Sequence, residues 1–308
     1  MRFFSIKDIM KSNKGVSLVI VAVSLTVLTI CAALAVDVGA AAIGRARLST
    51  ALDAAALAGA QEFISNRDNT ESIVRTYVEK NTNNLKEINT TVDAAARVVQ
   101  VNGIKTQESY FAKILGIDLF NISVTAAAKV ENISSLEGAR PLAIVQQNFT
   151  YGELYTLKEG GGGGNTGNYA AIAVGGTGSS VYRNNLLGGY DGTIKVGDRI
   201  ETETGNMAGS TETSINQLVH NCTHSPECTY KYYNRNCSRI IFLPVVDTLN
   251  VNGRSYVEVL GFATFFLEGI TDHGGHAEVI GRFITYNMEG QTASDINDYG
   301  TYGIRLVK

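Results

Sequence analysis

Residues 15–60 read GVSLVIVAVSLTVLTICAALAVDVGAAAIGRARLSTALDAAALAGA, and this stretch decides the fold of the N-terminal part. Residues 16–36 contain neither a charged residue nor a proline. At a helical rise of about 1.5 Å per residue they extend over roughly 31 Å, which matches the thickness of a bilayer core. Four hydroxyl side chains are compatible with lipid because each can donate to a carbonyl one turn earlier; they are Ser17, Ser24, Thr26 and Thr29. The sequence therefore predicts a single transmembrane helix over residues 16–36.

Two other interpretations of residues 16–36 are weaker. A core helix of a soluble protein rarely lacks every charge over six turns. A cleaved secretory signal has a shorter apolar core, and no uninterrupted helical pattern such as the one beginning at Asp37 follows it. Only the small residues around Leu34 imitate a signal-cleavage site.

The charges lie asymmetrically about the apolar stretch. Residues 1–15 hold Arg2, Lys7, Lys11 and Lys14 against Asp8, a net charge of +3. Since the 308 residues together carry −3, the remainder carries −6. Basic residues before a span keep that end in the cytoplasm, so residues 1–15 are predicted as a cytoplasmic tail and everything after residue 36 as extracytoplasmic. The acidic remainder lacks a basic face, so nucleic acid is not an expected partner.

An alanine-rich helical pattern continues beyond the apolar stretch. Leu48, Leu52, Ala55 and Gly59 recur at helical spacing, and small side chains on such a face let helices approach closely. The charges of this segment mark where the helix has left the hydrocarbon, because charged groups are costly in lipid. We expect helix-packing roles for Gly39, Gly44, Asp53 and Gly59. Asp37 is interpreted as a polar residue at the exit of the helix, with contact to a partner helix as the alternative.

The order of these elements resembles the N-terminal segment of the tight-adherence (Tad, or Flp) pilus-assembly proteins of the TadE/TadG-like group. A basic tail and a glycine precede an apolar helix. There follow Ala-Val-Asp-Val-Gly at residues 35–39, Arg-Ala-Arg-Leu at 45–48 and Asp-Ala-Ala-Ala-Leu-Ala-Gly-Ala at 53–60. The resemblance covers about 45 contiguous residues. It implies a bacterial envelope protein that serves Flp-type pili, with an anchoring helix, a globular part facing outward and no catalytic residues.

The sequence departs from the prepilin-like relatives at one position. Those relatives are cut after a glycine and carry glutamate at the fifth mature position. Gly15 follows Lys14 and is the possible cleavage site, but the fifth residue beyond it is Ile20. The chain therefore looks more like an uncut TadG-type protein than a pilin subunit. The Asp-x-Ser-x-Ser motif of some TadG-type adhesion domains is absent, and that domain is not predicted.

Residues 37–138 are predicted to form a small pilin-like α/β unit on the N-terminal helix. Residues 69–80 read as a helix and residues 109–115 as a short one. Residues 91–102 read as a strand that ends in a turn at Gly103, and residues 121–131 as a second strand. The second strand places four residues on one side: Ile122, Val124, Ala126 and Ala128. The predicted order is helix, strand, helix, strand.

Residues 139–308 read as a β-rich barrel or sandwich. Short apolar runs such as RIIFLPVV and SYVEVLGFATFFLEG alternate with turn signals, among them Asp191-Gly192 and Asn252-Gly253. A weaker resemblance links residues 190–210 to the outer domains of TadG-like proteins, and it implies no activity. The predicted fold class is therefore α+β.

The densest chemistry lies in His220, Cys222, His224, Cys228 and Cys237. Thiolate and imidazole are preferred zinc ligands, but the spacing fits no standard zinc finger. An extracytoplasmic location favours oxidation, so the first interpretation is a disulfide among Cys222, Cys228 and Cys237, with free thiols and metal as alternatives. Any of the three pairings is open, and the unpaired cysteine could form an intermolecular bridge. Cys31 lies in the predicted span and is not expected to take part.

The remaining polar loops favour structural interpretations. Asp272, His273 and His276 could perform acid–base chemistry, but their spacing also suits a glycine-rich turn between strands. The glycine run of residues 160–164 lacks the lysine and Ser/Thr of a phosphate loop, and residues 175–178 are similar. No Gly-x-Ser-x-Gly nucleophile elbow occurs.

The leading functional prediction is a non-enzymatic pilus-assembly or pilin-like surface protein. It is expected to be held in the cytoplasmic membrane by one span, to use no cofactor, and to contact Tad/Flp components. Self-association through the N-terminal helix is a further expectation. The alternatives are an envelope metal-dependent hydrolase that uses the Cys/His cluster, and an extracellular ligand-binding module that uses the glycine-rich loops.

Overall fold

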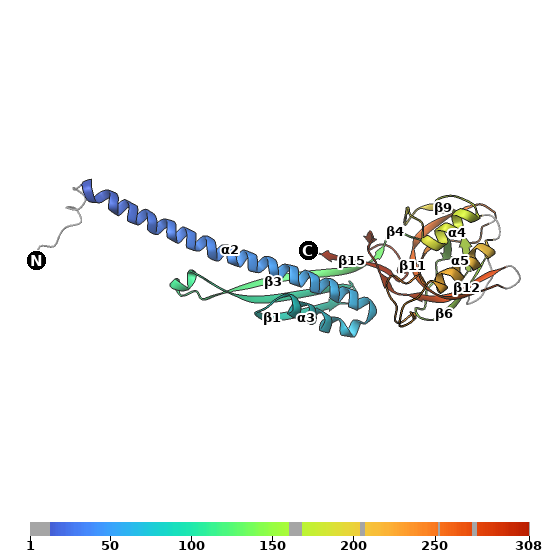
Figure 1. Cartoon of the computed structure of the whole chain (residues 1–308), viewed down its shortest axis with the longest axis horizontal. Helices are drawn as coiled ribbons and strands as arrows, with labels where there is room; N and C mark the ends of the chain where they lie inside the picture. The colour runs from blue at the N-terminus through green and yellow to red at the C-terminus, as the bar shows by residue number, and fades with distance from the viewer. Residues whose placement is uncertain (1–12, 160–167, 204–206, 252, 273–275, 308) are drawn as a thin grey trace, which may run out of the picture. The chain divides into compact units, whose positions relative to one another are not determined.

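The computed structural model describes residues 13–159, 168–203, 207–251, 253–272 and 276–307 (Figure 1). Most of the basic tail, the glycine run of residues 160–164, Asn252 and His273 lie outside the described residues. Contacts divide the chain into two compact units. Unit 1 holds residues 1–59, 68–128 and 306–308, and unit 2 holds residues 60–67 and 129–305.

The N-terminal helix α2 (Asn13–Ser65) is one continuous element of 53 residues. Among the described residues it is the one helix long and apolar enough to cross a membrane. None of its most apolar window is buried inside the protein, and leucine, valine and isoleucine side chains are exposed along residues 18–36. A core helix of a soluble protein would be mostly buried, so this exposure favours the membrane span.

The second half of α2 packs on a sheet. Leu48, Leu52 and Ala55 are fully buried, as their spacing predicts, and Gly59 is buried beside them. Figure 1 shows β3 (Leu119–Ile133) running along this part of the helix. The sheet has the order β1-β2-β3-β15-β13, and β14 also pairs with β3. Small residues on α2 let the sheet approach closely, which is why this face is rich in alanine and glycine.

Two helical predictions for unit 1 are confirmed. Helix α3 (Thr70–Asn81) covers the predicted residues 69–80 and buries Val74 and Val78. A short 3-10 helix, η2 (Ala112–Leu115), lies within the predicted residues 109–115. Another, η1 (Arg67–Asn69), joins α2 to α3.

The predicted strand over residues 91–102 is wrong, because a hairpin turn divides it. The strands are β1 (Leu85–Asp93) and β2 (Val98–Glu108), and they pair antiparallel. The Asp93 carboxylate accepts hydrogen bonds from the backbone of Ala95 and Ala96, both at 2.9 Å, and so folds the turn. Gly103 lies inside β2 opposite Ile88, so the predicted turn at Gly103 is also wrong.

Strand β3 confirms the prediction for residues 121–131. The four residues expected on one side are all buried: Ile122, Val124, Ala126 and Ala128. The order of elements in unit 1 is therefore helix, helix, strand, strand, 3-10 helix, strand, which differs from the predicted alternation.

Unit 2 is built on a sheet that closes on itself. Its order is β10-β5-β7-β6-β12-β11-β9, and β10 pairs with both β5 and β11. Its strands are β5 (Leu142–Val145), β6 (Leu154–Glu159), β7 (Asn168–Ala171), β9 (Arg199–Glu201), β10 (Ile240–Val246), β11 (Tyr256–Asp272) and β12 (Ala277–Ile284). Strands β4 (Ser135–Glu137) and β8 (Thr193–Lys195) form a separate pair. Strands β13 (Tyr286–Asn287), β14 (Thr292–Ala293) and β15 (Thr301–Val307) belong to the sheet of β3.

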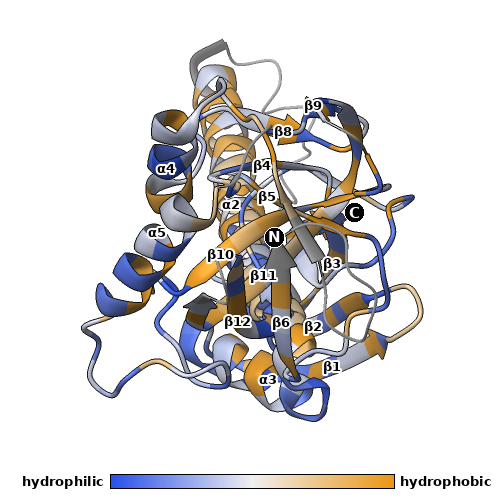
Figure 2. Cartoon of the chain, turned by 90° about the vertical axis from the view of Figure 1, so that its right-hand side faces the viewer, coloured by the Kyte–Doolittle hydropathy of each residue, from blue (hydrophilic) through white to orange (hydrophobic). Residues whose placement is uncertain are grey.

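Two helices of unit 2 escaped the sequence analysis: α4 (Ser179–Gly188) and α5 (Ala208–His220). Helix α5 packs against β11 and β12, and Ile215 and Leu218 join a core that includes Phe265 and Phe283. Figure 2 shows β10 as a hydrophobic strand and hydrophilic residues along α5. A helix with few large apolar residues resembles a loop in sequence, which is why it was missed. The α+β class is confirmed.

Candidate metal centre

The loop between α5 and β10 carries three cysteines and one histidine. The hydroxyl of Ser238 donates to the carbonyl of Leu218 at 2.7 Å, which ties the loop to the last turn of α5. The backbone N–H of Ile240 donates to the carbonyl of Cys237 at 3.0 Å, where the loop enters β10. Both ends of the loop are therefore held by the barrel and its helix.

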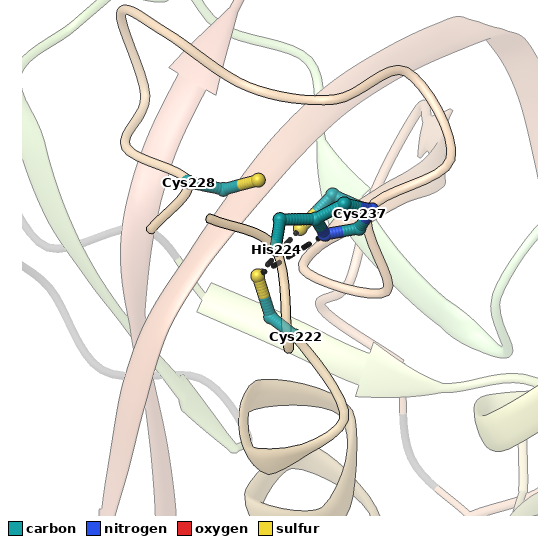
Figure 3. A group of neighbouring side chains, drawn as sticks. All are labelled: Cys222, His224, Cys228 and Cys237. Atoms are coloured by element: carbon teal, nitrogen blue, oxygen red, sulfur yellow. Dashed lines mark hydrogen bonds between the residues drawn. The ribbon is translucent and has the colours of Figure 1, made fainter. Parts of the chain in front are cut away.

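Four side chains of this loop point toward one another: Cys222, His224, Cys228 and Cys237 (Figure 3). Their ligand atoms all lie within 4.8 Å of one another. The sulfurs of Cys222 and Cys237 are 3.2 Å apart, and the Cys222 sulfur lies 3.7 Å from Nδ1 of His224. Cys228 and Cys237 are buried, whereas Cys222 and His224 are half-buried.

Backbone N–H groups point at all three sulfurs. The backbone of Asn234 donates to the sulfur of Cys228 at 3.4 Å. The backbones of His224 and Cys228 donate to the sulfur of Cys222, and the backbone of Arg239 donates to that of Cys237. Donors directed at sulfur favour the thiolate over the thiol.

The two neighbouring thiols differ in acidity. Burial raises the pKa of Cys222, but hydrogen bonds from His224, Cys237 and the backbone outweigh burial and lower this pKa from 9.0 to about 6. Burial raises the pKa of Cys237 to about 12, although the backbone of Arg239 acts in the opposite direction. A thiolate therefore exists at Cys222 at neutral pH, and the thiolate is the form that binds metal.

The arrangement suits a tetrahedral zinc ion. Zinc–sulfur bonds of about 2.3 Å and zinc–nitrogen bonds of about 2.0 Å place tetrahedral ligands roughly 3.5–3.8 Å apart. The observed separations of 3.2 and 3.7 Å, with none above 4.8 Å, need only small side-chain adjustments. Four protein ligands also fill the coordination sphere, which is typical of structural rather than catalytic zinc.

The predicted disulfide is not formed in this arrangement. All four cysteines carry free sulfurs, and 3.2 Å between Cys222 and Cys237 is too long for a disulfide bond. The sulfurs of Cys222 and Cys237 nevertheless lie 3.2 Å apart, so oxidation could join this pair with little movement.

Arg239 holds the cysteine loop against the barrel. Its Nε donates to the carbonyl of Leu267 on β11 at 2.7 Å, and its Nη1 donates to the carbonyl of Cys228 at 3.1 Å. Nη1 also pairs with Glu227 at 3.2 Å, and the guanidinium lies 4.6 Å from the centre of the Phe266 ring. Arg239 is a positioning residue for Cys228, and the sequence held no signal for this role.

The other predicted site residues lie apart from this centre. His220 is exposed in the last turn of α5 and is not among the four converging groups. Cys31 is exposed on α2. His276 is exposed beyond β11, and its predicted neighbour His273 lies outside the described residues.

The expected helix-packing residues have different surroundings. A Cβ added to Gly44 would lie 2.9 Å from Cδ1 of Ile122, and one added to Gly59 would lie 2.5 Å from Cγ2 of Val74. Both glycines therefore pack against the chain's own elements. A Cβ on Gly39 would meet no heavy atom within 4 Å. Asp53 is half-buried on the same helix.

The sequence analysis missed the role of Asp37. Its carboxylate accepts the backbone N–H groups of Tyr110 at 2.7 Å, Phe111 at 3.1 Å and Ala112 at 2.6 Å. Asp37 is therefore neither a simple exit residue nor a contact to a partner helix, but a cap for η2 within its own chain. A carboxylate suits this position because three N–H groups of a helix start are otherwise unpaired.

The glycine-rich residues 175–178 lead into α4. Gly175, Gly176 and Gly178 have φ values of 72°, 136° and 99°, which only glycine adopts readily. The N–H of Gly178 donates to the Glu203 carboxylate at 2.7 Å. An acid of the same chain thus occupies the N-terminus of α4, where an anionic ligand would otherwise bind.

Comparison with known proteins bears on the N-terminal helix. Residues 15–62 match the family of putative Flp pilus-assembly TadE/G-like proteins. No curated protein and no solved structure gave a significant match to the chain. The matched residues are nearly all of α2, and they include the apolar stretch, Asp37 and the glycines that pack on the sheet. The match confirms the resemblance: residues 15–62 are similar to the TadE/G-like Flp pilus-assembly family.

Proposed function

We propose that the protein is a non-enzymatic, membrane-anchored component of a Tad/Flp pilus system. One observation carries the proposal: the helix that matches the family is unburied over residues 16–36 and packs on its own sheet from Gly44 onward. Such a helix joins a membrane anchor directly to a folded unit. An anchor that continues into the fold transmits position and force, which suits assembly work better than turnover of a substrate.

We place the N-terminus in the cytoplasm and the residues after the span, from residue 37 onward, outside it. The support is the net charge of +3 over residues 1–15, immediately before the apolar stretch. Labelling of introduced cysteines in intact cells tests this orientation. Relative to the parent chain, whose own cysteines set the background, a cysteine at exposed Tyr232 should add label from an impermeant maleimide in intact cells, whereas one at Ser5 should add label only after lysis. The reverse pattern would contradict the orientation.

The partner surface that we propose is the outward side of α2. Small residues recur along it at helical spacing: Ala32, Ala35, Gly39, Ala42 and Ala46. Gly39 has open space where a side chain would be, and the buried side of the helix is already occupied by the sheet. Small residues let a second helix approach closely in lipid, so this side suits another Tad/Flp component or a second copy of the chain.

Photo-cross-linking in native cells tests the proposed function. A photoreactive amino acid at Ala42 should give adducts with Tad/Flp components or with the chain itself. The same group at Ser72, which is exposed on α3, is the matched control and should give none. Deletion of the gene should also reduce surface pili. Unchanged piliation together with no adduct at Ala42 would refute the proposal.

The hydrolase alternative finds no supporting feature in the Cys/His centre. A catalytic zinc keeps one coordination position open for water, whereas four side chains converge here. The centre therefore suits a structural role.

Processing at Gly15 is tested by the intact mass of protein extracted from native membranes. The full mass of 308 residues supports a permanently anchored assembly factor. Loss of the first 15 residues would instead identify a processed, pilin-like subunit.

A further inference from the structure

We infer that Cys222, His224, Cys228 and Cys237 bind a structural zinc ion that holds the loop between α5 and β10 on the barrel. The four ligand atoms converge within 4.8 Å, although they come from positions spread over residues 222–237. A surface loop of this length would not bring four zinc ligands together without a common partner, because each cysteine packs equally well alone as a small apolar residue.

The backbone donors and apolar side chains around the sulfurs also favour a bound metal. Every sulfur faces backbone N–H groups, and the buried pair Cys228 and Cys237 belongs to a cluster with Phe266 and Ile284. Donors directed at sulfur stabilise metal-bound thiolates, and an apolar shell excludes competing water. Zinc would bind the three cysteines as thiolates and His224 as neutral imidazole, so the thiol protons still present would be released and no electron would be transferred.

The site joins the loop to the end of α5 and to the start of β10. Cys222 follows α5, and Cys237 precedes β10. Arg239 donates to the carbonyl of Cys228 and to that of Leu267, and so holds this part of the loop next to β11. Zinc would therefore connect the end of α5, the loop and the start of β10. The resulting loss of loop freedom is the expected source of its stabilising effect.

The test compares zinc content, thiol state and thermal unfolding of the full chain purified in detergent without reductant. Stoichiometric zinc, a mass that shows no disulfide, and a melting temperature that falls by more than roughly 5 °C on chelation would support the site. His224→Ala and Cys228→Ser should lose the zinc. His220→Ala and Cys31→Ser are matched controls that should keep it.

Two results would overturn the proposal. The first is a protein without zinc whose mass is lower than that of the reduced chain by two hydrogen atoms, which identifies a disulfide. The second is equal zinc content in the His224→Ala and His220→Ala variants, which identifies adventitious binding. If Cys228→Ser does not fold, the proposal is still tested, because the change in melting temperature on chelation is measured on the natural chain.

A second and independent observation concerns the loop between β2 and β3. We propose that its apolar tip, formed by Tyr110, Phe111, Ile114, Ile117 and Leu119, inserts into the lipid surface beside the span. All five side chains are exposed, and Ile114 is 80% exposed. Contiguous apolar side chains are rarely left in water by a folded protein.

Asp37 places this tip at the level of the membrane boundary. It binds the backbone of residues 110–112 and is the first charged residue after the stretch of residues 16–36. Because that stretch matches the hydrocarbon thickness, Asp37 lies where acyl chains give way to headgroups. In Figure 1 the tip of the loop lies alongside α2 and points toward its N-terminal end.

Internal hydrogen bonds hold the conformation of the loop, which has the composition of an interfacial segment. The hydroxyl of Ser109 donates to the carbonyl of Ile117, and its N–H donates to the carbonyl of Asp118 at 3.0 Å. Gly116 closes η2 with a φ of 81°. Tyrosine favours the membrane interface, and exposed Lys113 can reach lipid phosphates while its stem stays in the apolar layer.

The chain contains no tryptophan, so single introduced tryptophans report on depth. Ile114→Trp in the full chain, reconstituted in phosphatidylcholine vesicles, should show blue-shifted emission that lipids brominated near the headgroup quench. Leu25→Trp should be quenched by lipids brominated deeper in the chain. Tyr232→Trp is the exposed control and should be quenched by aqueous iodide.

Three other fluorescence results would contradict the insertion of the tip or the membrane anchor. Iodide quenching of Ile114→Trp equal to that of Tyr232→Trp would overturn the insertion. Blue-shifted emission without quenching by brominated lipid would mean that protein, such as a second copy of the chain, covers the tip. Loss of lipid quenching at Leu25→Trp would overturn the membrane anchor itself.

Discussion

The carboxylate of Asp37 lies 2.6 Å from the backbone nitrogen of Ala112, although 75 positions separate the two residues. The contact joins the end of the apolar stretch of α2 to the loop between β2 and β3. It gives a definite structural role to the aspartate in the Ala-Val-Asp-Val-Gly element within the family match.

We predict that Asp37→Ala frees this loop. Three backbone N–H groups lose their acceptor, at a cost of about 1–2 kcal/mol because water can replace part of the interaction. Hydrogen exchange of residues 109–118 should accelerate while α3 stays protected. Asp53→Ala, which changes another acid of α2, is the control. Unchanged exchange in the loop would show that Asp37 does not hold it.

Gly59→Ala should destabilise unit 1, whereas Gly39→Ala should not. The new Cβ at Gly59 would lie 2.5 Å from Val74 and 3.1 Å from Val99, so the sheet and α3 must move. Overpacking of this kind costs about 1–3 kcal/mol. At Gly39 the space is open, and alanine gains up to about 1 kcal/mol of helix propensity. Thermal unfolding in detergent measures both, and equal melting temperatures would contradict this packing.

Glu131 and Arg305 form an ion pair that should make stability depend on acid. Arg305 donates to Glu131 at 2.6 and 3.0 Å, and Lys129 and Thr292 add hydrogen bonds at 2.9 and 2.8 Å. The hydrogen bond from Arg305 is the main cause that lowers the pKa of buried Glu131 from 4.5 to about 2. The folded pKa lies below the unfolded one, so the stabilisation is complete above pH 4.5 and is lost as the pH falls toward 2.

Glu131→Gln tests that dependence by urea unfolding at about pH 7 and about pH 3. The variant should lose about 2–3 kcal/mol at the higher pH and less at the lower one, because near pH 3 the unfolded natural chain already binds a proton at Glu131 that the folded chain does not, which favours unfolding. Glu289→Gln changes an exposed acid and serves as the control. An equal loss at both pH values would contradict the assignment of the acid dependence to Glu131.

Arg239→Lys should loosen the cysteine loop more than it weakens the barrel. Lysine keeps the positive charge but cannot donate to Leu267 and Cys228 from one planar fork. We expect faster alkylation of Cys228 and a loss of about 1–3 kcal/mol. Arg183→Lys on the exposed side of α4 is the control. A matching fall in stability without faster alkylation would show a general packing role instead of a positioning role for Cys228.

Local sequence patterns were sufficient for the elements that depend on neighbouring residues. The absence of charge over residues 16–36 predicted an apolar helix that is not buried in the protein. The spacing of Leu48, Leu52 and Ala55 predicted which side of its continuation is buried. Strand β3 was recognised from its alternation. The hairpin turn at residues 94–97 was missed because three alanines continue the composition of a regular element, and the Asp93 hydrogen bonds that fold it are not visible as periodicity.

Local patterns could not predict the contacts between distant segments. The cysteines and His224 were recognised as a group, but the choice among disulfide, free thiols and metal required the positions of their sulfurs. The role of Asp37 and that of Arg239 depend on backbone groups, which carry no residue-specific signal in a sequence.

The sequence by itself determined that this protein has one long apolar helix with a buried small-residue side, because hydropathy and helical periodicity act over a few residues. Only the tertiary structure decided what Asp37 holds, that β10 closes the sheet by pairing with β5 and β11, and that three cysteines and one histidine converge. Each of these contacts joins residues that are far apart in the sequence. Which residues meet is therefore decided by how the whole chain folds and not by the conformational preference of neighbouring residues.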